Sequence, residues 1–328
     1  MTLLVTGGSG LVGSHVIEAL RGRGEPVRAL ARGASRSAVE GLGAEAVVGD
    51  VTDPAAWRAA ARGVRAIVHS AALVQRRETW EHYVAVNVDA TRLAVEAARA
   101  TGARLVHVSS VAVYGGSAAY RPEPERRTED DPFRPIAERD FYARTKRMAE
   151  QVVRDAAVRG ALTAVALRPT VVYGERDRLF TPRAILAVRL GLVPRIGPGT
   201  NHLACVYAGN VAGAAVAALD APISGFRAYN VASDAPPRLT QREFITALAE
   251  ALGTRVRTIP IPAGLTRIAL GLVAGPRLAR AAVAFLAGEN PHADDRARAE
   301  LGWQPAFAAR EAVRRTVSWF LENEKPGH

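Results

Sequence analysis

The segment TGGSGLVG, residues 6–13, decides how this chain folds. It follows an apolar run, residues 3–5, and opens the helical pattern VGSHVIEALRGRG. Gly7, Gly10 and Gly13 have the GxxGxxG spacing, and Gly8, Gly10 and Gly13 also satisfy GxGxxG. Glycine lets the backbone turn tightly and approach a pyrophosphate, which the positive end of the following helix attracts. The segment therefore predicts a nucleotide-phosphate turn.

Short apolar runs alternate with amphipathic helical stretches along the chain. The predicted strands lie in LLVTG, PVRALA, AEAVVGD, RAIVHSA, RLVHVSS, LTAVALRP and AYNVAS. Such alternation predicts an α/β fold with a doubly wound parallel sheet, a Rossmann fold, covered by helices on both faces. One long helical pattern is YVAVNVDATRLAVEAARATG, residues 83–102.

The alternation breaks after about Tyr173, where glycine, proline and arginine become frequent. We expect residues 1–173 to form the dinucleotide-binding domain, with segments near 203–232 returning to it. Residues 174–328 should form mainly a smaller substrate-binding lobe over the C-terminal edge of the sheet.

Composition narrows the function classes. The 328 residues carry a formal charge of +11, but the arginines are scattered along the chain without a basic run, which does not favour nucleic-acid binding. The seven histidines lack ligand spacing, so we expect no metal site. Cys205 is the single cysteine and no basic leader precedes the first strand, which predicts a cytoplasmic protein.

An apolar stretch, LTRIALGLVAGPRLARAAVAFLAG, occupies residues 265–288. Arg267, Pro276, Arg277 and Arg280 interrupt it, so it should not span a membrane. Two interpretations stay open: it lines a site for a lipophilic substrate, or it is a buried lobe helix or dimer contact.

The residue at the end of the second strand should contact the adenosine ribose of a bound dinucleotide. There ALARGASR, residues 29–36, has Arg32 where an acid would bind a 2′-hydroxyl, with Arg36 behind it. An arginine suits a 2′-phosphate, so we expect NADP first and NAD second. Asp50, which closes AVVGD, should accept a hydrogen bond from the adenine amino group. The plainer alternatives are a surface arginine and a turn aspartate.

Residues 141–146, FYARTK, place Tyr142 and Lys146 on one face of a predicted helix. Of 43 basic residues only Lys146 and Lys325 are lysines. A nearby ammonium lowers the pKa of a phenol from about 10, which brings proton transfer closer to neutral pH. A flat guanidinium does not replace it. Taken alone, such a pair is usually an ordinary surface pair.

Ser110 ends the predicted strand RLVHVSS, at the edge where ligands bind in parallel sheets. Its hydroxyl should hold a substrate oxygen while Tyr142 transfers the proton. The alternative role for Ser110 is to cap a turn or helix.

These motifs together resemble the extended short-chain dehydrogenase/reductase family. The resemblance covers TGGSGLVG, Asp50, HSAA (69–72), Asn87 in NVDAT, SSVAVYG (109–115), YARTK and LRPTVVYG (167–174). The second half is most similar to the 3β-hydroxysteroid dehydrogenase branch. The resemblance implies a catalytic set of Ser110, Tyr142 and Lys146, and a homodimer through the helices that carry Asn87–Ala100 and Tyr142–Ala157. On this basis we expect the cofactor to be contacted by Gly7, Ser9, Gly10, Leu11, Val12, Gly13, Arg32, Asp50, Val51, Ala71, Ala72, Tyr142, Lys146, Pro169 and Val172.

The expected activity is NADP-dependent hydride transfer between nicotinamide and a hydrophobic secondary alcohol or ketone, of the 3β-hydroxysteroid or long-chain β-keto acid type. A nucleotide-sugar 4-epimerase with tightly bound NAD is the first alternative, which Arg32 disfavours. A dehydratase should carry an acidic pair where Val111 and Ala112 stand. A non-catalytic NADP-binding regulator is the remaining alternative, although such relatives typically lose the tyrosine or the lysine.

Overall fold

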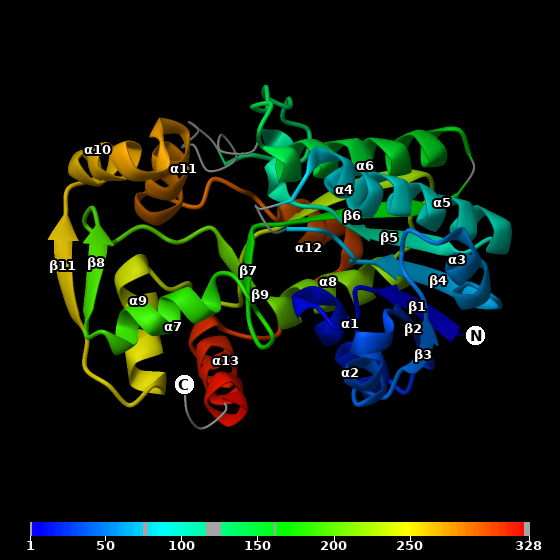
Figure 1. Cartoon of the computed structure of the whole chain (residues 1–328), viewed down its shortest axis with the longest axis horizontal. Coiled ribbons are helices and arrows are strands. Elements are labelled where there is room, and N and C mark those ends of the chain that lie inside the picture. The colour runs from blue at the N-terminus through cyan, green and yellow to red at the C-terminus, as the bar shows by residue number, and fades with distance from the viewer. Residues whose placement is uncertain (1, 75–77, 116–125, 161, 325–328) are drawn as a thin grey trace.

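The computed structural model describes residues 2–74, 78–115, 126–160 and 162–324. Its main sheet has seven parallel strands in the order β10-β6-β5-β4-β1-β2-β3 (Figure 1). The strands are β1 (Thr2–Thr6), β2 (Val27–Ala31), β3 (Glu45–Val48), β4 (Val64–His69), β5 (Arg104–Val108), β6 (Ala164–Pro169) and β10 (Phe226–Val231). Each predicted strand segment supplies one of them. The predicted Rossmann fold is therefore confirmed.

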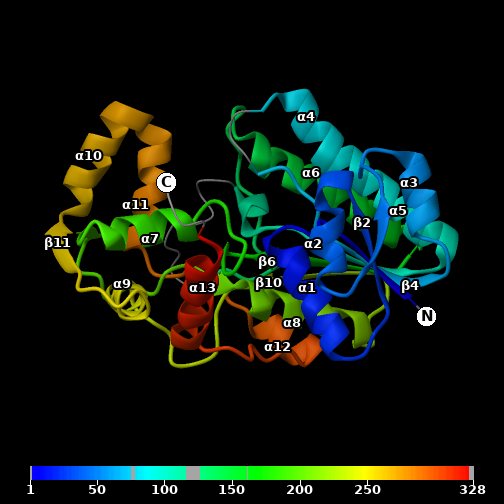
Figure 2. The same cartoon turned by 60° about the horizontal axis from the view of Figure 1, so that its bottom comes forward.

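Helices cover both faces of the sheet, which explains why its strands are almost continuously apolar. Helices α3 (Pro54–Ala60), α5 (Ala90–Thr101) and α6 (Phe141–Val158) pack on one face, around Ile67 and Leu105. Helices α1 (Leu11–Gly22), α8 (Ala208–Asp220) and α12 (Asp295–Leu301) pack on the other, around Val68 and Val106 (Figure 2). Alternate residues of each strand thus enter two separate cores.

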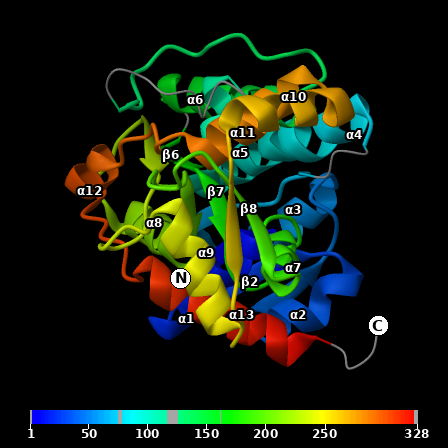
Figure 3. The same cartoon turned by 90° about the vertical axis from the view of Figure 1, so that its left-hand side faces the viewer.

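Most of the remaining elements form a lobe beside the carboxyl edge of the sheet (Figures 1 and 3). Its helices are α7 (Thr181–Arg189), α9 (Gln241–Ala251), α10 (Ala263–Ala274), α11 (Pro276–Ala287) and α13 (Ala309–Asn323). Two small parallel sheets pair β8 (Leu192–Ile196) with β11 (Arg257–Ile261), and β7 (Val171–Tyr173) with β9 (Cys205–Tyr207). The lobe has its own core around Phe244, Leu248 and Val313. The lobe therefore buries its own apolar surface and does not merely extend the main sheet.

The helical pattern at residues 83–102 is not one regular helix. It contains α4 (Trp80–Val84), a π-helical segment over Ala85–Asp89, and then α5. The wide turn carries the buried Asn87, whose amide nitrogen donates to Leu73 O (3.1 Å) and Thr145 Oγ1 (3.0 Å). Its amide oxygen accepts from Leu73 N at 2.6 Å. Asn87 thus ties the loop after β4 to helix α6, directly beside Lys146, as π-turns at functional sites often do.

The glycine turn between β1 and α1 is tightly packed. Gly7 adopts a φ of +70°, and Gly10 N donates to Gly7 O at 2.9 Å. A Cβ on Gly7 would lie 2.7 Å from Ala71 N, and a Cβ on Gly13 would lie 2.2 Å from Gly7 O. The turn therefore closes against the end of β4 and requires glycine on both sides.

We expect Gly13→Ala to lower the free energy of unfolding by about 1–3 kcal/mol, because the added methyl collides with backbone. The matched control is Gly22→Ala at the last residue of the same helix, where nothing lies within 4 Å of the added Cβ. That variant should gain about 0.5–1 kcal/mol. Urea unfolding followed by circular dichroism measures both; a Gly13→Ala protein as stable as wild type would contradict the packing described.

Candidate active site

The parallel sheet brings the predicted residues to one edge, because all seven strands end there. Each strand from β1 to β6 contributes a residue at or just beyond its carboxyl end: Gly7, Arg32, Asp50, Ala71, Ser110 and Pro169. Beyond Pro169, a Cβ on Gly174 would lie 3.4 Å from Leu11 Cδ1, so the segment after β6 reaches the start of α1. This edge is the candidate site.

Arg32 and Asp50 lie near each other at one end of the edge. Arg32 is exposed directly after β2. Asp50 Oδ1 accepts hydrogen bonds from Thr52 N (2.9 Å) and Thr52 Oγ1 (2.8 Å). Partial burial raises the pKa of Asp50, but these bonds and the Arg32 charge outweigh it and hold the pKa below its ordinary value. Arg36 instead binds Glu40, Nε to Oε1, at 2.8 Å.

Ser110 stands at the end of β5 and is 9% exposed. Its hydroxyl accepts a hydrogen bond from Ala112 N at 3.1 Å and caps the short 3₁₀ turn over Val111–Tyr114. The capping role considered from the sequence is therefore present. It uses a lone pair of the oxygen, which leaves the hydroxyl proton for donation. Capping and substrate binding are thus compatible in one residue.

Tyr142 lies in the first turn of α6, and its phenol is within hydrogen-bonding reach of the Ser110 side chain. Burial raises the pKa of Tyr142 above 10, the Ser110 hydrogen bond opposes this, and Tyr83 and Asp140 add to it. We expected Lys146 to lower this pKa, and the structure gives the opposite direction. The reason is that burial of the phenol outweighs the stabilising contacts, so the phenol remains protonated at neutral pH.

Lys146 is buried, with 2% of its surface exposed, and its Nζ donates to Val108 O at 2.5 Å. Burial lowers the pKa of Lys146 to about 8, against the raising effect of the Glu150 carboxylate. Tyr142, Lys146 and Glu150 follow one another at four-residue steps on one face of α6. The ammonium therefore sits between the candidate phenol and a buried acid.

Glu150 belongs to a buried ion pair that sequence reasoning missed. Arg168 Nη2 donates to Glu150 Oε1 at 2.6 Å, and Arg168 Nε donates to Oε2 at 3.1 Å. Ser109, the neighbour of Ser110, donates to Oε2 at 2.6 Å. Two sequence signals were available: a second four-residue step, from Lys146 to Glu150, and an arginine inside the buried strand LTAVALRP. The pair joins α6, β5 and β6 beneath the site.

Two buried histidines, His69 and His107, lie side by side on β4 and β5 with ring centroids 5.6 Å apart. Burial and then the Lys146 charge lower the pKa of His69 to about 3 and hold that of His107 well below 6.5. His69 Nδ1 meets Thr6 Oγ1 at 2.8 Å, and Nε2 meets Thr91 Oγ1 at 3.1 Å. Both rings are neutral near pH 7, so they add no positive charge beneath Lys146.

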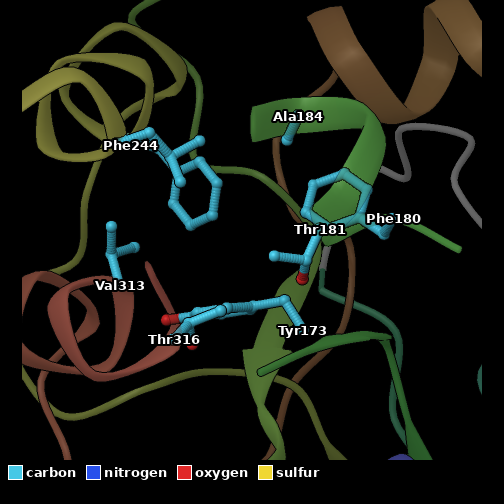
Figure 4. A pocket seen from close by; sticks show the side chains of 8 residues that line it. Tyr173, Phe180, Thr181, Ala184, Phe244, Val313 and Thr316 are labelled. Carbon is cyan, nitrogen blue, oxygen red and sulfur yellow. The ribbon is translucent and has the colours of Figure 1, made fainter. Parts of the chain in front are cut away.

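A small cavity lies inside the lobe, away from Ser110 and Tyr142. The side chains of Tyr173, Phe180 and Phe244 point toward it, and its volume is about 10 Å³ (Figure 4). This holds about one water molecule, so the cavity is a packing gap and not a substrate site.

Among the residues that the structure describes, no three histidine, cysteine or acidic side chains gather as metal ligands. In the same part of the chain, no helix is long and apolar enough to cross a bilayer.

We expect Lys146→Met to raise the free energy of unfolding at pH 7 by on the order of 2 kcal/mol, because a buried ammonium is replaced by an apolar chain. The folded-state pKa, about 8, lies below the ordinary 10.5, so the cost of burying the charge is complete below pH 8 and disappears above about pH 10.5. The advantage of the variant should therefore shrink between these pH values in urea unfolding. A variant less stable than wild type at pH 7 would show that the charge is stabilising.

Comparison with known proteins shows the family of the chain. Residues 3–232 match the model of the NAD dependent epimerase/dehydratase family. A 4-hydroxy-2-methyl-3-oxo-4-farnesyl-3,4-dihydroquinoline-1-oxide ketoreductase from Stigmatella aurantiaca is 33% identical, with 92% of each chain covered. The human 3 beta-hydroxysteroid dehydrogenase type 7 is 31% identical, over 97% of this chain and 95% of that protein.

Among solved structures, the UDP-glucose 4-epimerase of Thermus thermophilus in complex with NAD superposes with a TM-score of 0.74. It is 28% identical and is covered completely, against 99% of this chain. The family match spans more than half of the sequence and the named relatives span nearly all of it. The resemblance inferred from the motifs is thus confirmed: the chain belongs to the NAD dependent epimerase/dehydratase family, the extended short-chain dehydrogenases/reductases, and is an enzyme of the oxidoreductase type.

Proposed function

We propose that the protein is an NADP-dependent oxidoreductase that moves hydride between nicotinamide and a hydrophobic secondary alcohol or ketone. One observation carries the proposal: Ser110, Tyr142 and the buried Lys146 meet at the sheet edge that also holds the glycine turn. The turn fits a dinucleotide, because its glycines let the backbone close tightly between β1 and the N-terminus of α1, which attracts a pyrophosphate.

The raised pKa of Tyr142 suits a proton donor to the substrate oxygen. Nicotinamide, when bound, supplies or accepts the hydride. A phenol whose pKa is raised stays protonated at neutral pH and can give its proton to a developing alkoxide. Ser110 donates a hydrogen bond to the same substrate oxygen and so fixes its position. Lys146 holds a positive charge between Val108 O and Glu150, close to where that oxygen becomes negative.

A lipophilic substrate is supported by the relatives. The Stigmatella ketoreductase is named for a farnesylated quinoline oxide, and the human enzyme for 3β-hydroxysteroids. Both names describe a reacting oxygen on a large apolar molecule. We extend this to the present chain as a steroid-like or long-chain β-keto acid substrate.

A nucleotide-sugar 4-epimerase with tightly held NAD is the second candidate, favoured by the likeness to the Thermus epimerase over the whole chain. Arg32 at the end of β2 argues against it, because NAD offers a ribose hydroxyl there in place of a phosphate. The mass and absorbance of the co-purifying nucleotide distinguish the two: retained NAD supports the epimerase, and an empty or NADP-loaded site supports the reductase.

Two further parts of the proposal concern the assembly and the compartment. We propose a homodimer through α5 and α6, supported by the family resemblance and by Met148 and Val158, which are exposed on α6. A cytoplasmic location is supported by the single cysteine, which cannot form an internal disulfide.

Turnover with NADPH should occur for lipophilic ketones in a panel of 3-oxosteroids, long-chain β-keto acids and UDP- or dTDP-sugars. Tyr142→Phe should lose about 10²–10⁴ in rate, because the proton donor is gone, while NADPH binding remains. Tyr229→Phe is the matched control, since it removes a phenol that binds Glu300 elsewhere in the fold. Reaction of the sugars alone, or a Tyr142→Phe enzyme within threefold of wild type, would refute the proposal.

The enzyme should prefer NADPH over NADH, with Arg32 as the cause. A guanidinium makes charged hydrogen bonds to a 2′-phosphate that contribute about 1.5–3 kcal/mol, roughly ten- to a hundredfold in affinity. Arg32→Ala should lose much of this preference, and Arg32→Asp should shift it toward NADH. Arg62→Ala, also an exposed arginine, is the control. Fluorescence titration of the four proteins with NADPH and with NADH measures these affinities; equal or tighter NADH binding by wild type would overturn the assignment.

A further inference from the structure

The helical hairpin of α10 and α11 presents a strongly apolar surface to solvent. We define the α10 patch as Leu265, Ile268, Leu272 and Val273, which are 60%, 62%, 84% and 88% exposed. Leu265, Ile268 and Leu272 are spaced i, i+3, i+7 and therefore form one stripe along the helix. Contiguous apolar surface of this kind on a folded protein indicates a contact with another apolar phase or molecule.

The position of the hairpin keeps the α10 patch away from the rest of the fold. α10 packs chiefly against α11, with the half-buried Leu270 on the side opposite the stripe. Figure 2 shows α10 on the outer side of the hairpin, with α11 between α10 and the main sheet. The patch therefore does not belong to the helices that cover the main sheet. The hairpin can meet a broad flat surface without obstruction from the sheet.

The charges around the patch select among possible partners. Residues 251–288 contain five arginines and no aspartate or glutamate. The side chains of Arg255, Arg257, Arg267 and Arg280 are exposed, and no described acid forms an ion pair with any of these four. A second copy of this chain would bring the same positive charge against itself, which disfavours that occupant. An acid-free, arginine-bordered apolar helix instead matches an anionic lipid surface.

We propose that α10 docks the protein on the surface of an anionic phospholipid bilayer. The four aliphatic side chains enter the boundary between headgroups and acyl chains, and the arginines reach the lipid phosphates with their long side chains. The helix lies along the membrane surface and does not cross the bilayer, because α10 has only twelve residues. This membrane contact does not depend on the proposed reaction, because it uses none of the residues at the sheet edge.

The test is co-sedimentation of the purified full chain with vesicles of phosphatidylglycerol mixed with phosphatidylcholine, and with vesicles of phosphatidylcholine alone. Wild type should bind the anionic vesicles. Leu272→Ser/Val273→Ser should reduce that binding about tenfold or more, because both side chains leave the membrane boundary. Both residues are highly exposed, so the fold should be unaffected, and circular dichroism checks this.

Two controls distinguish vesicle binding through the α10 patch from nonspecific binding. Leu190→Ser changes a leucine that is 74% exposed on the chain after α7, outside the patch, and should bind vesicles like wild type. Arg267→Gln/Arg280→Gln should weaken binding about tenfold on anionic vesicles. The matched pair Arg58→Gln/Arg62→Gln, exposed on and after α3, should have little effect.

Several outcomes would overturn the proposal. One is wild type that stays in the supernatant with anionic vesicles. Others are equal binding to neutral vesicles, or a patch variant that binds as wild type does. A further contrary result is wild type that sediments as a dimer without lipid, becomes monomeric in Leu272→Ser/Val273→Ser, and ignores vesicles. That result would assign the patch to a second copy. None of these results bears on hydride transfer, which the Tyr142→Phe assay measures separately.

Discussion

The ion pair between Glu150 and Arg168 is the interaction on which the candidate active site depends. Both side chains are buried, and the bidentate geometry with the added Ser109 bond satisfies the carboxylate. Arg168 extends the connection through the Tyr114 hydroxyl to Asn230 on the edge strand β10. One buried network thus fixes α6, β5, β6 and β10 relative to one another, and with them Tyr142, Lys146 and Ser110.

The same network explains how a lysine is retained inside the protein. A buried ammonium is unfavourable, and here it has one carbonyl, Val108 O, and one nearby carboxylate, Glu150. Glu150 is already neutralised by Arg168, so it raises the pKa of Lys146 without fully restoring it. The neutral rings of His69 and His107 also lie near Lys146 and add no charge there. The site therefore holds a lysine that gives up its proton more readily than a surface lysine.

The fold and the edge residues were predictable because they follow local rules: glycine spacing, apolar runs and the four-residue step from Tyr142 to Lys146. The π-turn at Asn87 was not predictable, since one extra residue per turn hardly changes an apolar pattern. Glu150 and Arg168 were missed because a charged residue is ordinarily assigned to the surface, and only the packing of α6 on β6 buries them. The raised pKa of Tyr142 likewise depends on burial, which residue spacing does not reveal.

The position of β10 has a consequence for how the chain folds. β10 pairs with β6 from Ala164 with Phe226 to Pro169 with Val231, and α7, β8, β9 and α8 all lie between them in sequence. The other six strands can pair as soon as β6 has been synthesised. β10 can pair only after the long segment between β6 and β10 has also been synthesised. Such distant pairings are slow steps in folding. Because Asn230 completes the Arg168 network, the strand of the main sheet that is synthesised last is also the one that finishes the support of the active site.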